Sequence, residues 1–124
     1  MKALIVHTGG GLGDVLLSGP VVDTLHNAGY TVDFLARSGT AQAVADHPNV
    51  HELMVIEGKD PAGIKEMNRW AGRLRERAYD LSILLWSTTR WAWTLYWAGI
   101  PVRVKTPFGE RVFVQIVDTL VHPD

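Results

Sequence analysis

A run of glycines between an apolar segment and an amphipathic segment is the feature that most restricts how this chain folds. Residues 3–7 (ALIVH) are mostly apolar, and four glycines with a single leucine then occupy positions 9–13. From Asp14 to residue 27, apolar side chains recur at the three- and four-residue spacing of a helix. The order predicts a buried strand, a tight turn and a helix that packs back onto the strand.

The same alternation of apolar runs and helical patterns continues along the chain. Further strands are predicted over residues 31–36, 51–56, 81–85 and 102–104, and further helices over residues 39–46, 61–77, 88–98 and 111–121. Strands that alternate with helices through short connections favour right-handed βαβ units and a parallel sheet covered on both faces. We therefore predict an α/β fold: one Rossmann-like three-layer αβα domain over residues 1–124, with a mostly parallel sheet of about five strands.

Composition narrows the class of protein. Apolar residues make up 47% of the chain and the net charge is −1, so nothing indicates a nucleic-acid partner. There is no cysteine, which excludes disulfides and thiolate metal sites, and Pro48 separates His47 from His51, so we expect no metal site. No window approaches the ~20 apolar residues of a membrane span, and the default expectation is a cytoplasmic protein.

The glycine turn lies where parallel sheets of this kind bind ligands, beyond the carboxyl end of a strand. Gly9 and Gly11 fit the first two positions of the G-x-G-x-x-G dinucleotide fingerprint, but Asp14 occupies the third, where it would face pyrophosphate. A carboxylate there suits a neutral hydroxyl better than a phosphate. Two interpretations of Asp14 stay open: it caps the helix, or it accepts a proton from a hydroxyl. His7, beside the turn, either binds a ligand or is structural.

Three segments resemble one enzyme family. Residues 4–25 (LIVHTGGGLGDVLLSGPVVDTL), 79–85 (YDLSILL) and 98–104 (AGIPVRV) are similar to the N-terminal half of family 9 glycosyltransferases, the ADP-heptose:lipopolysaccharide heptosyltransferases and their relatives. The resemblance implies a GT-B architecture, in which two Rossmann-like domains face each other across a cleft. Its N-terminal half receives the acceptor, and its C-terminal half, which binds the nucleotide-sugar donor, lies outside these 124 residues. It further implies an inverting transfer that needs no metal or other cofactor.

The resemblance assigns roles to particular residues. The family's proposed general base falls on Asp14, and Arg90 matches a basic position of the family. Arg37 ends a predicted strand and would therefore line the crevice. The candidates for acceptor binding are Thr8, Gly10, Gly11, Leu12, Gly13, Arg37 and Arg90. The implied partners are a glycan or lipid-linked sugar acceptor and a nucleotide-sugar donor.

Two hypotheses of function remain at this point. The first is the acceptor half of such a transferase, inactive alone. The second is an isolated non-catalytic Rossmann-like module that binds a sugar or nucleotide or self-associates. Tryptophans gather over residues 86–97, where they suit core packing, a homo-oligomer interface or sugar contact. Basic residues over 65–77 suit a solvated helix face, or peripheral contact with the inner face of the cell membrane.

Overall fold

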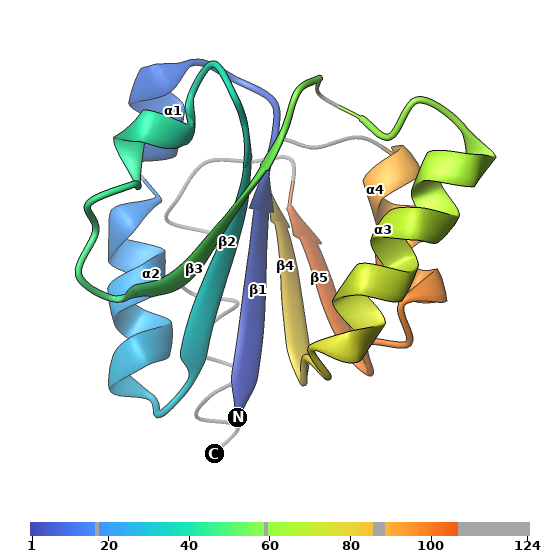
Figure 1. Cartoon of the computed structure of the whole chain (residues 1–124). Helices are drawn as coiled ribbons and strands as arrows, with labels where there is room; N and C mark the ends of the chain where they lie inside the picture. The colour runs from blue at the N-terminus through green and yellow to red at the C-terminus, as the bar shows by residue number, and fades with distance from the viewer. Residues whose placement is uncertain (17, 59, 86–88, 107–124) are drawn as a thin grey trace.

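The part of the chain that the structure describes forms a five-stranded parallel sheet with helices on both faces (Figure 1). The computed structural model describes residues 1–16, 18–58, 60–85 and 89–106. In chain order the elements are β1 (Lys2–His7), α1 (Leu12–Leu16), α2 (Gly19–Asn27), β2 (Thr31–Arg37), the 3₁₀ turn η1 (Ala41–Ala43), β3 (Val50–Ile56), α3 (Ile64–Glu76), β4 (Leu81–Leu85), α4 (Thr89–Trp97) and β5 (Val102–Thr106). The strand order is β3-β2-β1-β4-β5, which confirms the predicted Rossmann-like α/β fold (Figure 1).

The sheet separates two hydrophobic cores. In β1, Ala3 and Ile5 face the core that α1 and α2 cover, whereas Leu4 and Val6 face the core that α3 and α4 cover. Figure 1 shows the two helix pairs on opposite sides of the sheet. Since successive side chains of a strand point to opposite faces, a strand buried on both faces must be apolar at every position. The continuous apolar run at the start of the sequence is explained by this central place.

The helices differ from their predicted extents. The single helix predicted over residues 14–27 is divided into α1 and α2, because Pro20 lies in the first turn of α2 and has no N–H to continue an earlier helix. The helix predicted over residues 39–46 is only the short turn η1, and α3 begins at Ile64 rather than at Pro61. The helix predicted over residues 111–121 lies outside the described residues. No described helix is long and apolar enough to cross a bilayer.

Two tryptophans anchor the core beneath α3 and α4. Trp91 of α4 is completely buried, and its ring meets that of Trp70 edge-on at a centroid distance of 5.6 Å. Trp93, two residues along the same helix, is 54% exposed, and its ring meets that of the exposed Tyr96 edge-on. The tryptophan-rich helix therefore has one face in the core and one face in solvent.

We expect Trp91→Ala to destabilise the domain by about 3–5 kcal/mol, because it removes a large buried ring and leaves a cavity beside Trp70. The matched substitution Trp93→Ala should cost less than about 1 kcal/mol, since that ring contributes one exposed edge contact. Denaturant unfolding of the two variants measures the difference. Equal losses would contradict the assignment of the two faces.

Candidate functional site

The glycine turn extends from the carboxyl end of the central strand. β1 is hydrogen-bonded to β2 on one side and to β4 on the other, so the turn after His7 lies at the middle of the sheet's carboxyl edge. Helix α1, which follows the turn, packs against η1 from the next connection. Two loops from neighbouring strands thus meet at the edge where sheets of this topology bind ligands.

Asp14 is fixed within this turn while its side chain stays exposed. Its Oδ2 accepts a hydrogen bond from the backbone N–H of Gly11 at 2.8 Å. Gly11 directly precedes α1 and Asp14 is the third residue of that helix, so the bond has the geometry of the returning half of a capping box. Asp14 therefore caps the start of α1 from within the helix, as its third residue, and not from the position before the helix as the sequence suggested. The bond uses one of the two carboxylate oxygens.

Gly10 is the glycine that this arrangement requires. Its φ is +67°, in the left-handed region that residues with a Cβ rarely adopt. A Cβ at this position would lie 2.7 Å from Asp14 Oδ2 and 3.1 Å from Asp14 Cβ. By contrast, a Cβ at Gly13 would meet no atom within 4 Å. The turn therefore requires a residue without a side chain at position 10, where the Asp14 carboxylate folds back over the backbone.

Arg37, the last residue of β2, is tied to the same turn. Its Nη2 donates a hydrogen bond to the carbonyl oxygen of Gly10 at 2.9 Å. A Cβ at Gly39 would come within 2.9 Å of Arg37 Nη1, so that glycine leaves room for the guanidinium. The structure thus brings Arg37 to the turn that contains Gly10 and Asp14. In the sequence, Arg37 lies 27 positions after Gly10 and 23 positions after Asp14.

His7 lies at the base of the turn and is 1% exposed. Its neighbours in the sheet, in register, are Ala36 of β2 and Leu85 of β4. Neither ring nitrogen has a hydrogen-bond partner among the described residues. Burial lowers the pKa of His7 below its ordinary value of 6.5, and the negative charge of Asp14 opposes that effect.

The other predicted site residues have different surroundings. Thr8 is completely buried, whereas Leu12 is 41% exposed at the start of α1. Arg90 lies on α4 and donates a hydrogen bond from Nη1 to the Pro61 carbonyl oxygen at 3.2 Å, which ties it to the connection before α3. The role of each of these residues in binding an acceptor stays a prediction.

Comparison with known proteins gives structural relatives. No protein-family model matches the chain, and no curated protein sequence matches it significantly. The chain is similar to the E. coli ADP-heptose LPS heptosyltransferase II, at 27% identity over 85% of this chain and 30% of that protein, with a TM-score of 0.70. It is also similar to the E. coli heptosyltransferase WaaC, solved with ADP, at 27% identity over 68% of this chain and 29% of that protein, with a TM-score of 0.51.

A glycosyl transferase family 9 protein from Veillonella parvula has the same fold, at 21% identity over 82% of this chain and 30% of that protein, with a TM-score of 0.70. The likeness to the two heptosyltransferases confirms the resemblance to heptosyltransferases that the sequence suggested, and the Veillonella protein shows that the fold is shared. The chain forms a glycosyltransferase-like domain. It spans about 30% of the length of each of these proteins.

At the opposite edge of the sheet, the glycosyltransferase-like domain contains a polar cluster that the sequence did not reveal. Asp33 of β2 is completely buried and accepts hydrogen bonds from the Tyr79 hydroxyl at 2.5 Å and from His51 Nδ1 at 3.1 Å. The β2–β3 register shifts between Val32 and Asp33, which leaves His51 as an extra residue that can reach the carboxylate. Burial and the bond to Asp33 raise the pKa of Tyr79.

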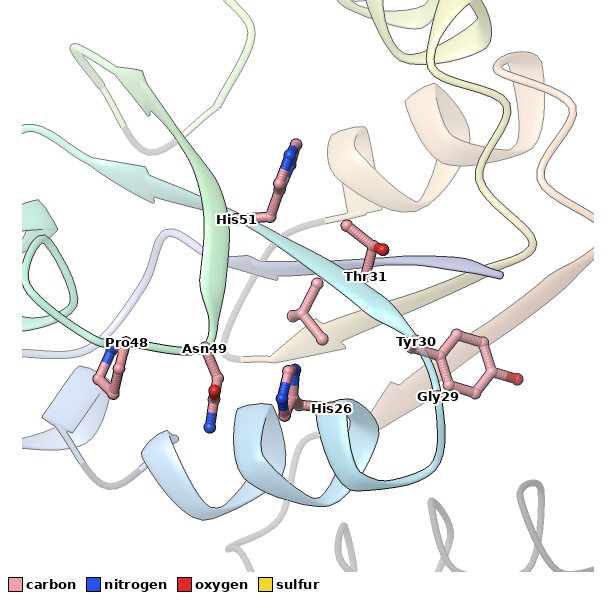
Figure 2. A pocket seen from close by; sticks show the side chains of 8 residues that line it. His26, Gly29, Tyr30, Thr31, Pro48, Asn49 and His51 are labelled. Atoms are coloured by element: carbon pink, nitrogen blue, oxygen red, sulfur yellow. The ribbon is translucent and has the colours of Figure 1, made fainter.

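Next to this cluster is a cavity of about 410 Å³, drawn in Figure 2. It is lined by His26, Gly29, Tyr30, Thr31, Val32, Pro48, Asn49 and His51. The lining residues come from the end of α2, from the connections that lead into β2 and β3, and from the first residues of these strands, at their amino ends. The cavity is therefore separate from the glycine turn, which lies at the carboxyl ends. Among the described residues, no group of three or more metal-binding side chains is placed to hold an ion.

Two surface regions of the glycosyltransferase-like domain are relevant to the predicted self-association and to the predicted membrane contact. A cavity of about 480 Å³ is lined by Ala92, Trp93, Tyr96 and Arg103, and Arg103 lies over the Tyr96 ring at 4.9 Å. On α3, Arg69 pairs with Glu66 at 3.1 Å. Also on α3, Arg73 lies over the Trp70 ring at 4.3 Å. Self-association through the aromatic surface and membrane contact through the basic helix stay predictions.

Gly10→Ala should destabilise the domain by about 1–2 kcal/mol, because the new Cβ must adopt a left-handed conformation and displace the Asp14 carboxylate. Gly13→Ala should be neutral or stabilising by up to ~1 kcal/mol, since alanine favours the helix and meets nothing. Thermal or denaturant unfolding provides the measurement. If both variants behaved alike, the fold-back of Asp14 over Gly10 would be wrong.

The lowered pKa of His7 predicts a loss of stability in acid. Between pH 6.5 and the lower pKa of the folded state, the unfolded chain binds a proton at His7 that the folded domain does not, so the free energy of unfolding falls as the pH falls. His7→Leu should reduce this dependence. It should also raise stability at pH 7 by about 1–3 kcal/mol, because it removes two unpaired buried nitrogens. Unfolding curves from pH 7.5 to 5 measure both effects; a steeper acid loss in the variant would contradict them.

Proposed function

We propose that this chain is the acceptor-binding, N-terminal domain of a heptosyltransferase-like inverting glycosyltransferase of GT-B architecture. The full protein transfers a sugar from a nucleotide-diphosphate donor to a lipopolysaccharide or other glycan acceptor. The observation that carries the proposal is the exposed Asp14 carboxylate, held by the Gly11 amide at the carboxyl end of the central strand. The similarity to two heptosyltransferases at 27% identity supports the reaction class.

Asp14 acts as the general base in this proposal. Its Oδ1, which takes no part in the bond to Gly11, accepts the proton of an acceptor hydroxyl as that oxygen forms a bond to the anomeric carbon of the donor. The bond from the anomeric carbon to the diphosphate oxygen breaks, and the nucleoside diphosphate leaves with the electron pair. Because the acceptor attacks from the face opposite the leaving group, the anomeric configuration inverts.

The charges around the turn suit a sugar whose reacting end is neutral. The Asp14 carboxylate repels phosphate from the turn itself. Arg37 and Arg90 supply cations at the ends of β2 and at the start of α4, and they would hold phosphate or carboxylate groups carried elsewhere on the acceptor. Thr8 and the turn residues from Gly10 to Gly13 would shape the pocket for the reacting sugar.

The donor site belongs to a second domain in this proposal. The chain spans about 30% of the heptosyltransferase that it resembles, and one Rossmann-like layer offers only one wall of a GT-B cleft. The 124 residues should therefore show no transfer alone, and activity should require the polypeptide that carries both domains.

The decisive variant is Asp14→Asn, which keeps the shape of the side chain and removes its capacity to take a proton. In the polypeptide that carries both domains, we expect the turnover number to fall by about 10²–10⁴-fold with little change in acceptor KM. Asp46→Asn is the matched control, since Asp46 is exposed at the end of the η1 connection, and it should leave turnover unchanged. Transfer is measured by release of nucleoside diphosphate. Turnover within a few-fold of wild type in Asp14→Asn would reject the assignment.

A further inference from the structure

Arg37 is placed beside the glycine turn by the pairing of β1 with β2. His7, the last residue of β1, is level with Ala36, so Arg37 lies one position further along β2, where the turn begins. The backbone that follows is held to β3, because the Ser38 N–H donates a hydrogen bond to the Ile56 carbonyl oxygen at 2.8 Å. The Arg37 side chain therefore leaves the end of a strand whose backbone is fixed by its neighbours.

One peptide unit connects Arg37 to Asp14. Its carbonyl oxygen, from Gly10, accepts a hydrogen bond from Arg37 Nη2 at 2.9 Å. Its N–H, from Gly11, donates a hydrogen bond to Asp14 Oδ2 at 2.8 Å. Because a peptide is planar, a group that fixes the oxygen also fixes the direction in which the N–H points. Hydrogen bonds in a chain polarise one another, so a cation at the oxygen also strengthens the N–H as a donor.

The guanidinium of Arg37 is largely built into the turn. A Cβ at Gly39 would lie 2.9 Å from Arg37 Nη1, so the chain has no side chain at the position that the guanidinium passes. The Nε of Arg37 is buried and has no hydrogen-bond partner among the described residues. Since Nη2 is bonded to the Gly10 oxygen and Nε is closed off from solvent, these contacts favour a role within the turn.

We propose that Arg37 is a positioning residue for Asp14, and that it acts through the peptide between Gly10 and Gly11. The guanidinium fixes that peptide, and the peptide directs the carboxylate so that Oδ1 faces the acceptor hydroxyl. The inference rests on the proposed function, in which Asp14 is the general base. It is a different role from binding a charged group of the acceptor, because a positioning residue affects neutral and anionic acceptors alike. A misplaced base slows the chemical step without weakening ground-state binding, so turnover falls while acceptor KM is unchanged.

The link through the peptide can be tested on the 124-residue chain without a transfer assay. Arg37→Met keeps an unbranched side chain and removes its charge and its donors. In this variant the Gly11 amide proton, followed by NMR, should shift upfield and exchange with solvent about tenfold faster, because its hydrogen bond to Asp14 weakens. Arg69→Met is the matched control, since Arg69 is exposed on α3 and pairs with Glu66. It should leave the Gly11 resonance in place, and an unchanged Gly11 resonance in Arg37→Met overturns the inference.

The effect on catalysis is tested in the polypeptide that carries both domains, with one neutral and one phosphorylated acceptor. Arg37→Met should lower the turnover number about ten- to hundredfold for both acceptors, with each KM within about twofold of wild type. Arg69→Met should retain wild-type turnover. A rise in KM for the phosphorylated acceptor alone, with turnover unchanged, shows that Arg37 binds an anion and overturns the positioning role.

Gly39→Ala tests the same role while the arginine is kept. The new Cβ must displace the guanidinium, because it would otherwise lie 2.9 Å from Nη1. Turnover should fall about three- to tenfold in Gly39→Ala, but no further when Gly39→Ala is added to Arg37→Met, since the displaced group is then absent. Gly72→Ala is the matched control, because a Cβ at Gly72 would meet no atom within 4 Å. Additive losses in the double variant overturn the route through Arg37.

The two proposals fail in distinguishable ways. Full activity in Asp14→Asn rejects the general base and with it the proposed function, while the Gly11 resonance still reports whether Arg37 holds the turn. Activity lost in Asp14→Asn but kept in Arg37→Met rejects only the positioning role. Wild-type resonances outside the turn in Arg37→Met show that its loss of turnover is not a loss of folding.

Discussion

The hydrogen bond between the Gly11 amide and the Asp14 carboxylate sets the geometry of the whole candidate site. It returns the side chain of the third residue of α1 onto the backbone that leads into the helix. That return is sterically allowed only because Gly10 has no Cβ and adopts a φ of +67°. Arg37 then fixes the same peptide from the side by binding the Gly10 carbonyl oxygen. One hydrogen bond between a backbone amide and a nearby side chain thus fixes the position of the Asp14 negative charge.

The sheet supplies the framework for this arrangement. Because β1 pairs with both β2 and β4 in parallel register, His7 and Arg37 reach the same edge of the sheet from different strands. The continuous burial of β1 holds that edge rigidly, since both faces of the strand are covered by packed helices. These side chains are therefore carried by the ends of strands, and the turn beside them is held by hydrogen bonds.

The strands and the glycine turn that follows the first of them could be predicted from the sequence because their signals are local. The run from Ala3 to Val6 is apolar at every position, and only a strand with both faces buried requires that. The glycines before Asp14 signal a backbone that comes close to another group, and the structure shows that the nearest such group is Asp14 itself. What escaped prediction depends on long-range partners. The bond between Asp33 and Tyr79 joins residues 46 positions apart. The register shift that brings His51 to Asp33 leaves no mark in either strand's sequence.

The glycine turn carries one negative charge and a backbone amide that is already hydrogen-bonded, and this combination favours one class of ligand over others. A site for pyrophosphate needs a surplus of backbone amides or cations at the helix start, but here the Gly11 amide is already occupied by Asp14. The Arg37 guanidinium donates to the Gly10 carbonyl oxygen, so part of its hydrogen-bonding capacity is also committed to the turn. What is left is a carboxylate oxygen facing solvent, which accepts a hydrogen bond or a proton. A hydroxyl group complements it, and a sugar hydroxyl meets that requirement without the repulsion that an anion would experience.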